Sequence, residues 1–277
     1  MEKVRAAHVT AKALKTRRTF LGIDPHLPMC PYALCDAMGF DLRFVKIPSF
    51  EGMYIANQNL ILISAERPEG RKRFTCGHEI GHHVLQHGTV IDEILECGSN
   101  KQEEEEADLF ASMLLMPSSA VNRTLLRYGI ATDNISSADA YTLSKYFGVS
   151  YQAFITHIYI NLRLITYKHY QKLKASNLSE IRRSITGLEI KSQVFNVGHW
   201  WDEKAIELEV GDYIVFPTTF SIDGPQIFEQ VSNSQKIIYK AIAPGITRIF
   251  SKDWSCFSKI SRYKFQGIYQ YKYDEEE

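Results

Sequence analysis

The sequence predicts an α+β fold, in which a region that mixes helices with a few strands is followed by a smaller, β-rich α+β region. Two observations support this. Apolar residues recur at helical spacing through much of the chain up to Gly187, whereas short segments rich in Ile, Val, Tyr and Phe dominate after it. A composition of 45% hydrophobic and 23% charged residues is that of an ordinary globular protein, which excludes disordered and fibrous classes.

Charge and cysteine usage narrow the class further. The 32 basic residues balance the 32 acidic ones, so no net field draws the whole chain to nucleic acid or to an anionic membrane. The five cysteines form no CxxC pair and give no sign of a disulfide framework. No stretch approaches the roughly 18 apolar residues of a membrane span, and the N-terminus lacks the apolar core of a signal peptide. We therefore expect a cytoplasmic protein.

The first elements are indicated by periodicity and by proline. Residues 3–20 carry apolar side chains at helical spacing, whereas three prolines confine residues 21–38 to loop and a short helix. LRFVKIPSF at 42–50 and MYIANQNLILIS at 53–64 have the apolar runs and alternation of strands. Within the second segment, the polar residues 57–59 predict a tight turn, and therefore a hairpin or a bent pair of strands.

Four helices are predicted next. A helix over 69–87 is bracketed by a proline and a glycine, and one over 101–115 opens with acidic residues and is stopped by a proline. Two shorter helices, at 137–147 and 151–162, are separated by a Gly-Val-Ser turn.

Basic residues accumulate between 166 and 187, and the texture beyond is that of short strands. These strands are expected at 190–197, 205–210, 213–216, 237–242 and 246–250. The sequence thus divides into residues 1–117, a helical module over 118–165, a basic helical linker over 166–187 and a β-rich domain over 188–277.

The sequence His78-Glu79-Ile80-Gly81-His82 matches H-E-x-x-H inside the helix predicted over 69–87. Four residues of separation set both imidazoles on one helix face, one turn apart, where they can share a metal ion. Glu79, beside the first ligand, suits the role of general base toward a water molecule. The motif therefore predicts a catalytic metal site.

Two alternatives stand beside this interpretation. The histidines and the glutamate could be only the solvated face of a surface helix. A second register also exists, because His83 and His87 are likewise four apart, but Val84 occupies the place of the glutamate. We interpret His83 as a packing residue or an outer partner of the site, and His87 as a surface helix end, where a cation is favoured.

The helix predicted over 101–115 offers the third ligand that a catalytic zinc site needs. Glu104 and Asp108 lie one turn apart on one face, with small residues alongside that would let two helices approach closely. Glu104 would bind the metal and Asp108 would orient a ligand histidine. Glu106 is the less favoured alternative ligand. An acidic helix start also meets the macrodipole without any metal, and this explains Glu103 and Glu105, predicted to be solvated.

RKRFTCGHEIGHHVLQHG, followed one helix later by EEEADLFASMLLMP, resembles the ImmA/IrrE metallopeptidases over residues from about 20 to 165. The resemblance implies a gluzincin-like fold, a catalytic Zn2+ and limited proteolysis of a helix-turn-helix transcriptional repressor. It implies His78 and His82 as ligands, Glu79 as base and a glutamate of the acidic run as third ligand. On this interpretation, residues 60–63 are expected at a sheet edge, where an extended substrate would pair with them.

TLSKYFGVSYQAFITHI resembles the turn and second helix of a helix-turn-helix, with Ser150 as N-cap. The would-be recognition helix, YQAFITHIYIN, contains no Lys or Arg, although phosphate and guanine contacts call for them. We therefore expect this module to pack on the peptidase or to recognise protein, with DNA binding less favoured. The β-rich domain is interpreted as a sensor or partner-binding region. The alternative function is a non-enzymatic regulator or ligand sensor with a structural metal.

Overall fold

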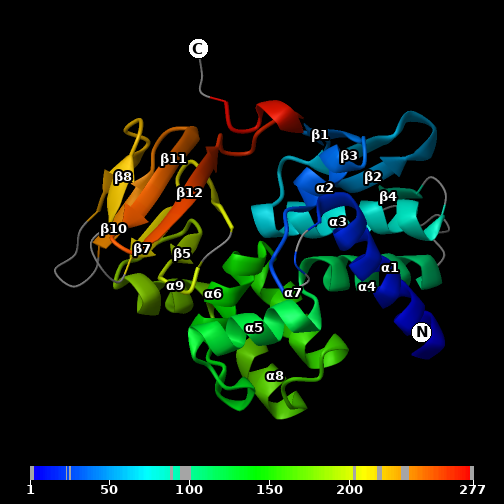
Figure 1. Cartoon of the computed structure of the whole chain (residues 1–277), viewed down its shortest axis with the longest axis horizontal. Coiled ribbons are helices and arrows are strands. Elements are labelled where there is room, and N and C mark those ends of the chain that lie inside the picture. The colour runs from blue at the N-terminus through cyan, green and yellow to red at the C-terminus, as the bar shows by residue number, and fades with distance from the viewer. Residues whose placement is uncertain are drawn as a thin grey trace. The chain divides into compact units, whose positions relative to one another are not determined.

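The computed structural model describes residues 3–274 except 23, 25, 88–89, 94–100, 202–203, 217–219 and 232–236. The predicted α+β class is confirmed (Figure 1). Contacts divide the chain into two compact units. The first comprises Met1–Arg123, Phe147–Ala153 and Gln266–Tyr269; the second comprises Thr124–Tyr146, Phe154–Phe265 and Gln270–Glu277. The four-part division by sequence is finer than this one and stays a prediction.

The first unit combines a mixed sheet with helices. Its helices are α1 (Lys3–Leu21), α2 (Pro31–Ala37), α3 (Glu69–Leu85), α4 (Lys101–Leu115) and the first part of α5 (Ser118–Tyr128). Its strands are β1 (Asp41–Val45), β2 (Phe50–Ile55), β3 (Leu60–Ser64), β4 (Val90–Glu93) and β13 (Gly267–Ile268), in the spatial order β13-β1-β3-β2-β4. The predicted hairpin is confirmed, since β2 and β3 are antiparallel around the 3-10 turn Ala56–Gln58.

The expectation that residues 60–63 form a sheet edge is wrong. β3 pairs in parallel with β1 on one side and antiparallel with β2 on the other, so its main chain is used in the sheet. Ile61 and Ile63 are fully buried, as suits a central strand. In the described part of this sheet the edge positions belong to β4 and β13.

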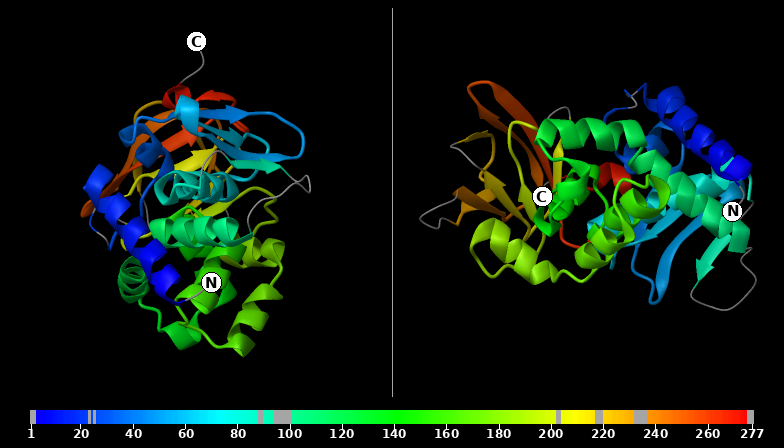
Figure 2. Two further views of the ribbon diagram at one scale, coloured as in Figure 1. Left: turned by 90° about the vertical axis from the view of Figure 1, so that its right-hand side faces the viewer. Right: turned by 90° about the horizontal axis from the view of Figure 1, so that it is seen from below.

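The central feature of the first unit is the packing of α3 between the sheet and α4. Two glycines make the approach of α4 close: a Cβ at Gly77 would lie 3.4 Å from the Cβ of Ala111, and a Cβ at Gly81 would lie 3.1 Å from Cδ1 of Phe110. The prediction that Ala107 and Ala111 permit a close helix pair is thereby confirmed. α1 packs beside α4 (Figure 2).

Arg17 ties α1 to the end of α4. Its side chain is 1% exposed, and its guanidinium donates to the carbonyl oxygens of Leu114 and Leu27. The Leu114 carbonyl belongs to the last turn of α4, where helix carbonyls lack an intrahelical partner. Burial lowers the pKa of Arg17 to about 10, a value at which it still carries its charge at neutral pH.

The second unit contains the remaining helices and two four-stranded sheets of described strands. Its helices are α6 (Ser137–Phe147, of which Phe147 groups with the first unit), the second half of α7 (Tyr151–Thr156), the π-helical His157–Asn161, α8 (Tyr167–Lys174) and α9 (Leu178–Thr186). The strands are β5 (Val194–Asn196), β6 (Ile206–Glu209), β7 (Tyr213–Phe216), β8 (Ser221–Asp223), β9 (Phe228–Gln230), β10 (Ile237–Ala241), β11 (Gly245–Ser251) and β12 (Trp254–Ser261). Their orders are β5-β7-β10-β9 and β6-β12-β11-β8.

The β-rich texture beyond residue 188 is confirmed, but its longest strand, β12, escaped prediction. Its inward positions alternate correctly, yet one of them is Ser258, which interrupts the apolar pattern. The segment interpreted as a basic helical linker is helical, since it forms α8 and α9, and its role as a linker stays a prediction. Ile181 and Ile185 of α9 are buried, so this helix contributes to the core of its unit. No helix among the described residues is long and apolar enough to cross a membrane.

The helix-turn-helix interpretation stays a prediction. The structure has two helices in this segment, α6 and α7, with a short turn between them. The Ala153 amide donates to Oγ of Ser150 at 3.1 Å, as an N-cap requires. The turn contacts the start of α3, because a Cβ at Gly70 would lie 2.6 Å from the carbonyl carbon of Val149. α6 is held within the second unit by Lys145, whose Nζ donates to Oε1 of Gln193 at 2.6 Å.

The close α3–α4 packing yields a paired test. Gly81→Ala should lower the free energy of unfolding by about 1–3 kcal/mol, because the added methyl group meets Phe110 and the backbone of Ala107. Gly77→Ala, which meets Ala111 at an ordinary contact distance, should be neutral or stabilise by about 0.5–1 kcal/mol. Urea titration measures both. Equal effects of the two substitutions would contradict the packing described here.

Candidate active site

The two histidines of the motif lie side by side on α3. Nε2 of His78 and Nε2 of His82 are 2.9 Å apart, and their side chains are 7% and 1% exposed. The interpretation of this helix as a solvated surface face is therefore wrong, because the face is buried under α4. Two buried imidazoles that converge through the same ring atom offer two ligand atoms to one metal ion.

α4 brings Glu104 to this pair. Its carboxylate oxygens lie 3.2 Å from Nε2 of His78 and 3.7 Å from Nε2 of His82. The ligand atoms of these three residues all lie within 4.8 Å of one another, close enough to hold one ion. Glu106 points elsewhere, with Oε1 2.5 Å from Nε of Arg5 and 2.9 Å from Nε2 of Gln102. The structure thus places Glu104, and not Glu106, beside the histidines.

Each of the two histidines has a second partner at its other ring nitrogen. Nδ1 of His78 lies 2.9 Å from Oδ1 of Asp108, as the sequence predicts. Nδ1 of His82 lies 3.1 Å from Nδ1 of His87, whose Nε2 is 3.4 Å from Oε2 of Glu106. Such partners fix the orientation and tautomer of a ligand imidazole.

The interpretation of His87 as a surface helix end is wrong. α3 ends at Leu85, and Gln86 adopts a left-handed conformation with φ 65°. This turn brings the His87 amide back to the carbonyl oxygen of His82 at 3.0 Å and leaves only 5% of the His87 side chain exposed. Sequence reasoning missed the role of His87 because it predicts a helix that continues to residue 87. A helix predicted to end at Leu85 would have placed His87 after the helix, where the chain can turn back toward His82.

The carboxylates and histidines of the site shift one another's pKa values. Burial, the largest influence, lowers the pKa of His78, but the hydrogen bonds to Asp108 and Glu104 outweigh it and raise the pKa to about 10. Burial and the neighbouring His78 lower the pKa of His82 to about 4. The hydrogen bond from His78 lowers the pKa of Glu104. The pKa shifts of His78 and Glu104 are thus both in the direction that favours the charged form.

Glu79 lies on the side of α3 that faces β2. It is fully buried, and the space in front of its carboxylate is provided by Gly52, where a Cβ would lie 2.7 Å from Oε1 of Glu79 and would collide with Thr75. The pairing of β2 with β4 is irregular between Phe50 and Gly52. A residue with a side chain at position 52 would displace the carboxylate. Sequence reasoning did not identify this glycine.

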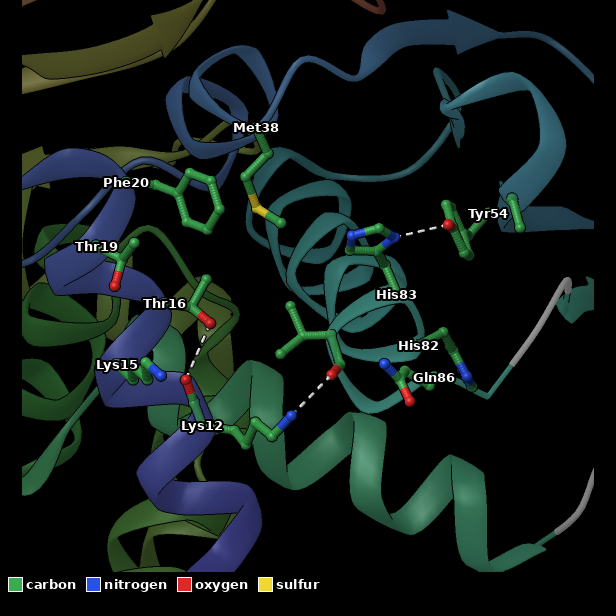
Figure 3. Close-up of a pocket in the computed structure, with 12 residues that line it drawn as sticks. Lys12, Lys15, Thr16, Thr19, Phe20, Met38, Tyr54, His82, His83 and Gln86 are labelled. Carbon is green, nitrogen blue, oxygen red and sulfur yellow. Dashed lines mark hydrogen bonds between the residues drawn. The ribbon is translucent and has the colours of Figure 1, made fainter.

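His83 packs against the sheet, as one of its two interpretations held. Its Nδ1 lies 2.6 Å from the hydroxyl of Tyr54 (Figure 3), and its ring meets that of Phe40 edge to face. A cavity of about 580 Å³ opens beside this end of α3, lined among others by His82, His83, Lys12 and Lys15. A second hollow, of about 290 Å³, is lined by His78, Glu104, Asp108, Glu51, Arg71, Phe74 and Thr75.

Glu105 is exposed and Glu103 partly exposed, in line with the prediction that both are solvated. Among the described cysteines, no disulfide bond is formed by Cys30, Cys35, Cys76 or Cys256. Cys97 lies outside the described residues.

Comparison with known proteins shows which family the region around the site resembles. Residues 35–158 match the model of a peptidase family described as the IrrE N-terminal-like domain. This part of the chain is thus an IrrE N-terminal-like domain, of the ImmA/IrrE family. The radiation response metalloprotease IrrE of Deinococcus radiodurans is 34% identical over 97 residues, which cover 33% of this chain and 29% of that protein. The matched region contains α3 and α4, so the motif, Glu104 and Asp108 all lie inside the ImmA/IrrE domain.

The partners of the two histidines can be tested by metal affinity. Asp108→Ala and His87→Ala should each weaken metal binding roughly 10- to 100-fold, because each removes the group that orients a ligand imidazole. Competition with a chromogenic chelator measures the affinity. Glu103→Ala is the matched control, since it removes a carboxylate of α4 that, among the described contacts, does not reach a ligand histidine. Unchanged affinity in His87→Ala would refute the role assigned to His87.

Proposed function

We propose that this protein is a zinc-dependent endopeptidase that performs limited, site-specific proteolysis of a helix-turn-helix transcriptional repressor. The observation that supports this most directly is the convergence of His78, His82 and Glu104 with Glu79 one residue beyond the first ligand. The metallopeptidase family of the domain supports the same reaction class.

The donor set fits Zn2+. Two imidazole nitrogens and a carboxylate are ligands of catalytic zinc sites, which keep a fourth position open. Tetrahedral coordination at about 2.0–2.1 Å separates ligand atoms by about 3.3 Å. The two Nε2 atoms are 2.9 Å apart, and the two carboxylate oxygens of Glu104 lie near that value, with Oε2 3.2 Å from Nε2 of His78 and Oε1 3.7 Å from Nε2 of His82. His78, His82 and Glu104 would therefore hold the ion with small adjustments of their side chains.

The chain's own residues account for the remaining steps. When bound, zinc supplies a Lewis acid that polarises the peptide carbonyl. Glu79 takes a proton from the attacking water and can return it to the leaving amine, which is the work of a general base and then a general acid. Asp108 and His87 hold the two histidines in fixed orientations, so the positions of the ligands do not change during the reaction.

Residues outside the catalytic site would account for the narrow substrate range. More than 150 residues follow the motif helix, and the hydrolytic chemistry needs few of them. Contacts away from the scissile bond are how a protease selects one folded partner. We assign this role to residues 118–165 and to the β-rich domain, and we place the reaction in the cytoplasm, where such a repressor acts.

The Glu79→Gln variant distinguishes a loss of catalysis from a loss of metal binding. The amide cannot accept the proton, whereas all three ligands remain, so cleavage should fall by at least about 100-fold while the zinc content stays at wild-type level. Incubation with candidate repressors, followed by mass spectrometry of the fragments, measures the cleavage.

One cut that depends on Glu79 supports the proposal. Indiscriminate digestion of casein would contradict the narrow substrate range. Tight, salt-sensitive binding to duplex DNA without any cleavage would favour a non-enzymatic regulator in place of a protease.

A further inference from the structure

We propose that Arg71 recognises an acidic side chain of the substrate about three residues away from the scissile bond. The inference rests on the proposed peptidase function and adds a substrate class to it. It follows from where Arg71 lies on α3, from the hollow that it shares with the metal-binding residues, and from the charges around it.

Arg71 and His78 lie on one face of α3. Seven residues separate them, which is close to two helical turns, so both side chains project in similar directions. At 1.5 Å per residue, the separation along the helix axis is about 10 Å. An extended peptide advances about 3.3 Å per residue, so this distance corresponds to about three residues of substrate.

The two residues also border the same hollow. The cavity of about 290 Å³ is lined by Arg71 and by the candidate ligands His78 and Glu104. A peptide whose scissile bond lies at the ligands can therefore place a neighbouring side chain against Arg71 without leaving this hollow. The Arg71 side chain is 58% exposed, which leaves it accessible to such a chain.

At this end of the hollow, Arg71 shares its carboxylate partner with a second arginine. Glu51 pairs with two guanidinium groups, with Oε1 2.6 Å from Nη2 of Arg67 and Oε2 2.9 Å from Nε of Arg71. The charge of Glu51 is therefore divided between Arg71, which lines the hollow, and Arg67, which does not. The other two carboxylates of the lining, Glu104 and Asp108, both contact His78.

The ion pair also orients Arg71. Because Glu51 is held by Arg67 and its side chain is only 13% exposed, it anchors the guanidinium through Nε. A guanidinium carries five N–H donors, and its terminal nitrogens match the two oxygens of a carboxylate. An anchored arginine loses less conformational freedom on binding than a mobile one. These properties favour an aspartate or glutamate side chain as the occupant.

The experiment is cleavage of a position-scanning peptide library by wild-type protein and by two charge-reversal variants. Wild type should prefer Asp or Glu over Asn or Gln at a position two to four residues from the cut, by about two- to fivefold in kcat/KM. Arg71→Glu should abolish or reverse the preference. Arg43→Glu is the matched control: it reverses the charge of another exposed arginine that is paired with one carboxylate, Asp41, but Arg43 does not line the hollow, and the variant should keep the preference. Circular dichroism checks that both variants are folded.

A second readout keeps the inference separate from the proposed function. Binding of fluorescein-labelled peptides from the library to Glu79→Gln protein is measured by anisotropy, with and without Arg71→Glu. Weaker binding of acidic peptides in the double variant supports the inference even if the peptides are not cut. Cleavage that depends on Glu79 but shows no acidic preference, or a preference that Arg71→Glu leaves unchanged, overturns the inference while the peptidase function stands.

Discussion

The candidate site depends on the close approach of two helices. The histidines belong to α3 and the third ligand belongs to α4, so the ligand set exists only where these helices come within reach of one another. Gly77 and Gly81 on one helix and Ala107 and Ala111 on the other remove the side chains that would hold them apart. Arg17 fastens the end of α4 to α1. The two glycines in the helix interior cost local stability relative to alanine, and the packing that they permit offsets this cost.

Around this helix pair, the protein surrounds two buried imidazoles with anionic and polar partners. Burial alone would discourage charge at this site, but Asp108, Glu104 and the pair of His87 with Glu106 supply compensating interactions. Glu106 is itself held ionised by Arg5, whose hydrogen bond lowers the pKa of Glu106 to about 2. Two glutamates of one acidic run therefore have different contacts. Glu104 faces His78 and His82, whereas Glu106 contacts His87, which in turn contacts His82.

The parts of the site that sequence predicts are those fixed within single helices. The four-residue spacing of His78 and His82, and of Glu104 and Asp108, places each pair on one face whatever the rest of the chain does. The missed features depend on contacts distant in sequence. His87 is buried because the chain turns at Gln86 toward α4. β3 is central and not an edge because β1 and β2 flank it, with β13 arriving from near the end of the chain.

The most direct test of the shared metal site is the zinc content of purified wild-type protein and of two variants in the acidic run. Inductively coupled plasma mass spectrometry should find about one zinc per chain in wild type and in Glu106→Gln, and a clear loss in Glu104→Gln, because only Glu104 faces both histidines. A metal-free wild-type protein of undiminished stability, or a loss of zinc in Glu106→Gln with retention in Glu104→Gln, would contradict the account.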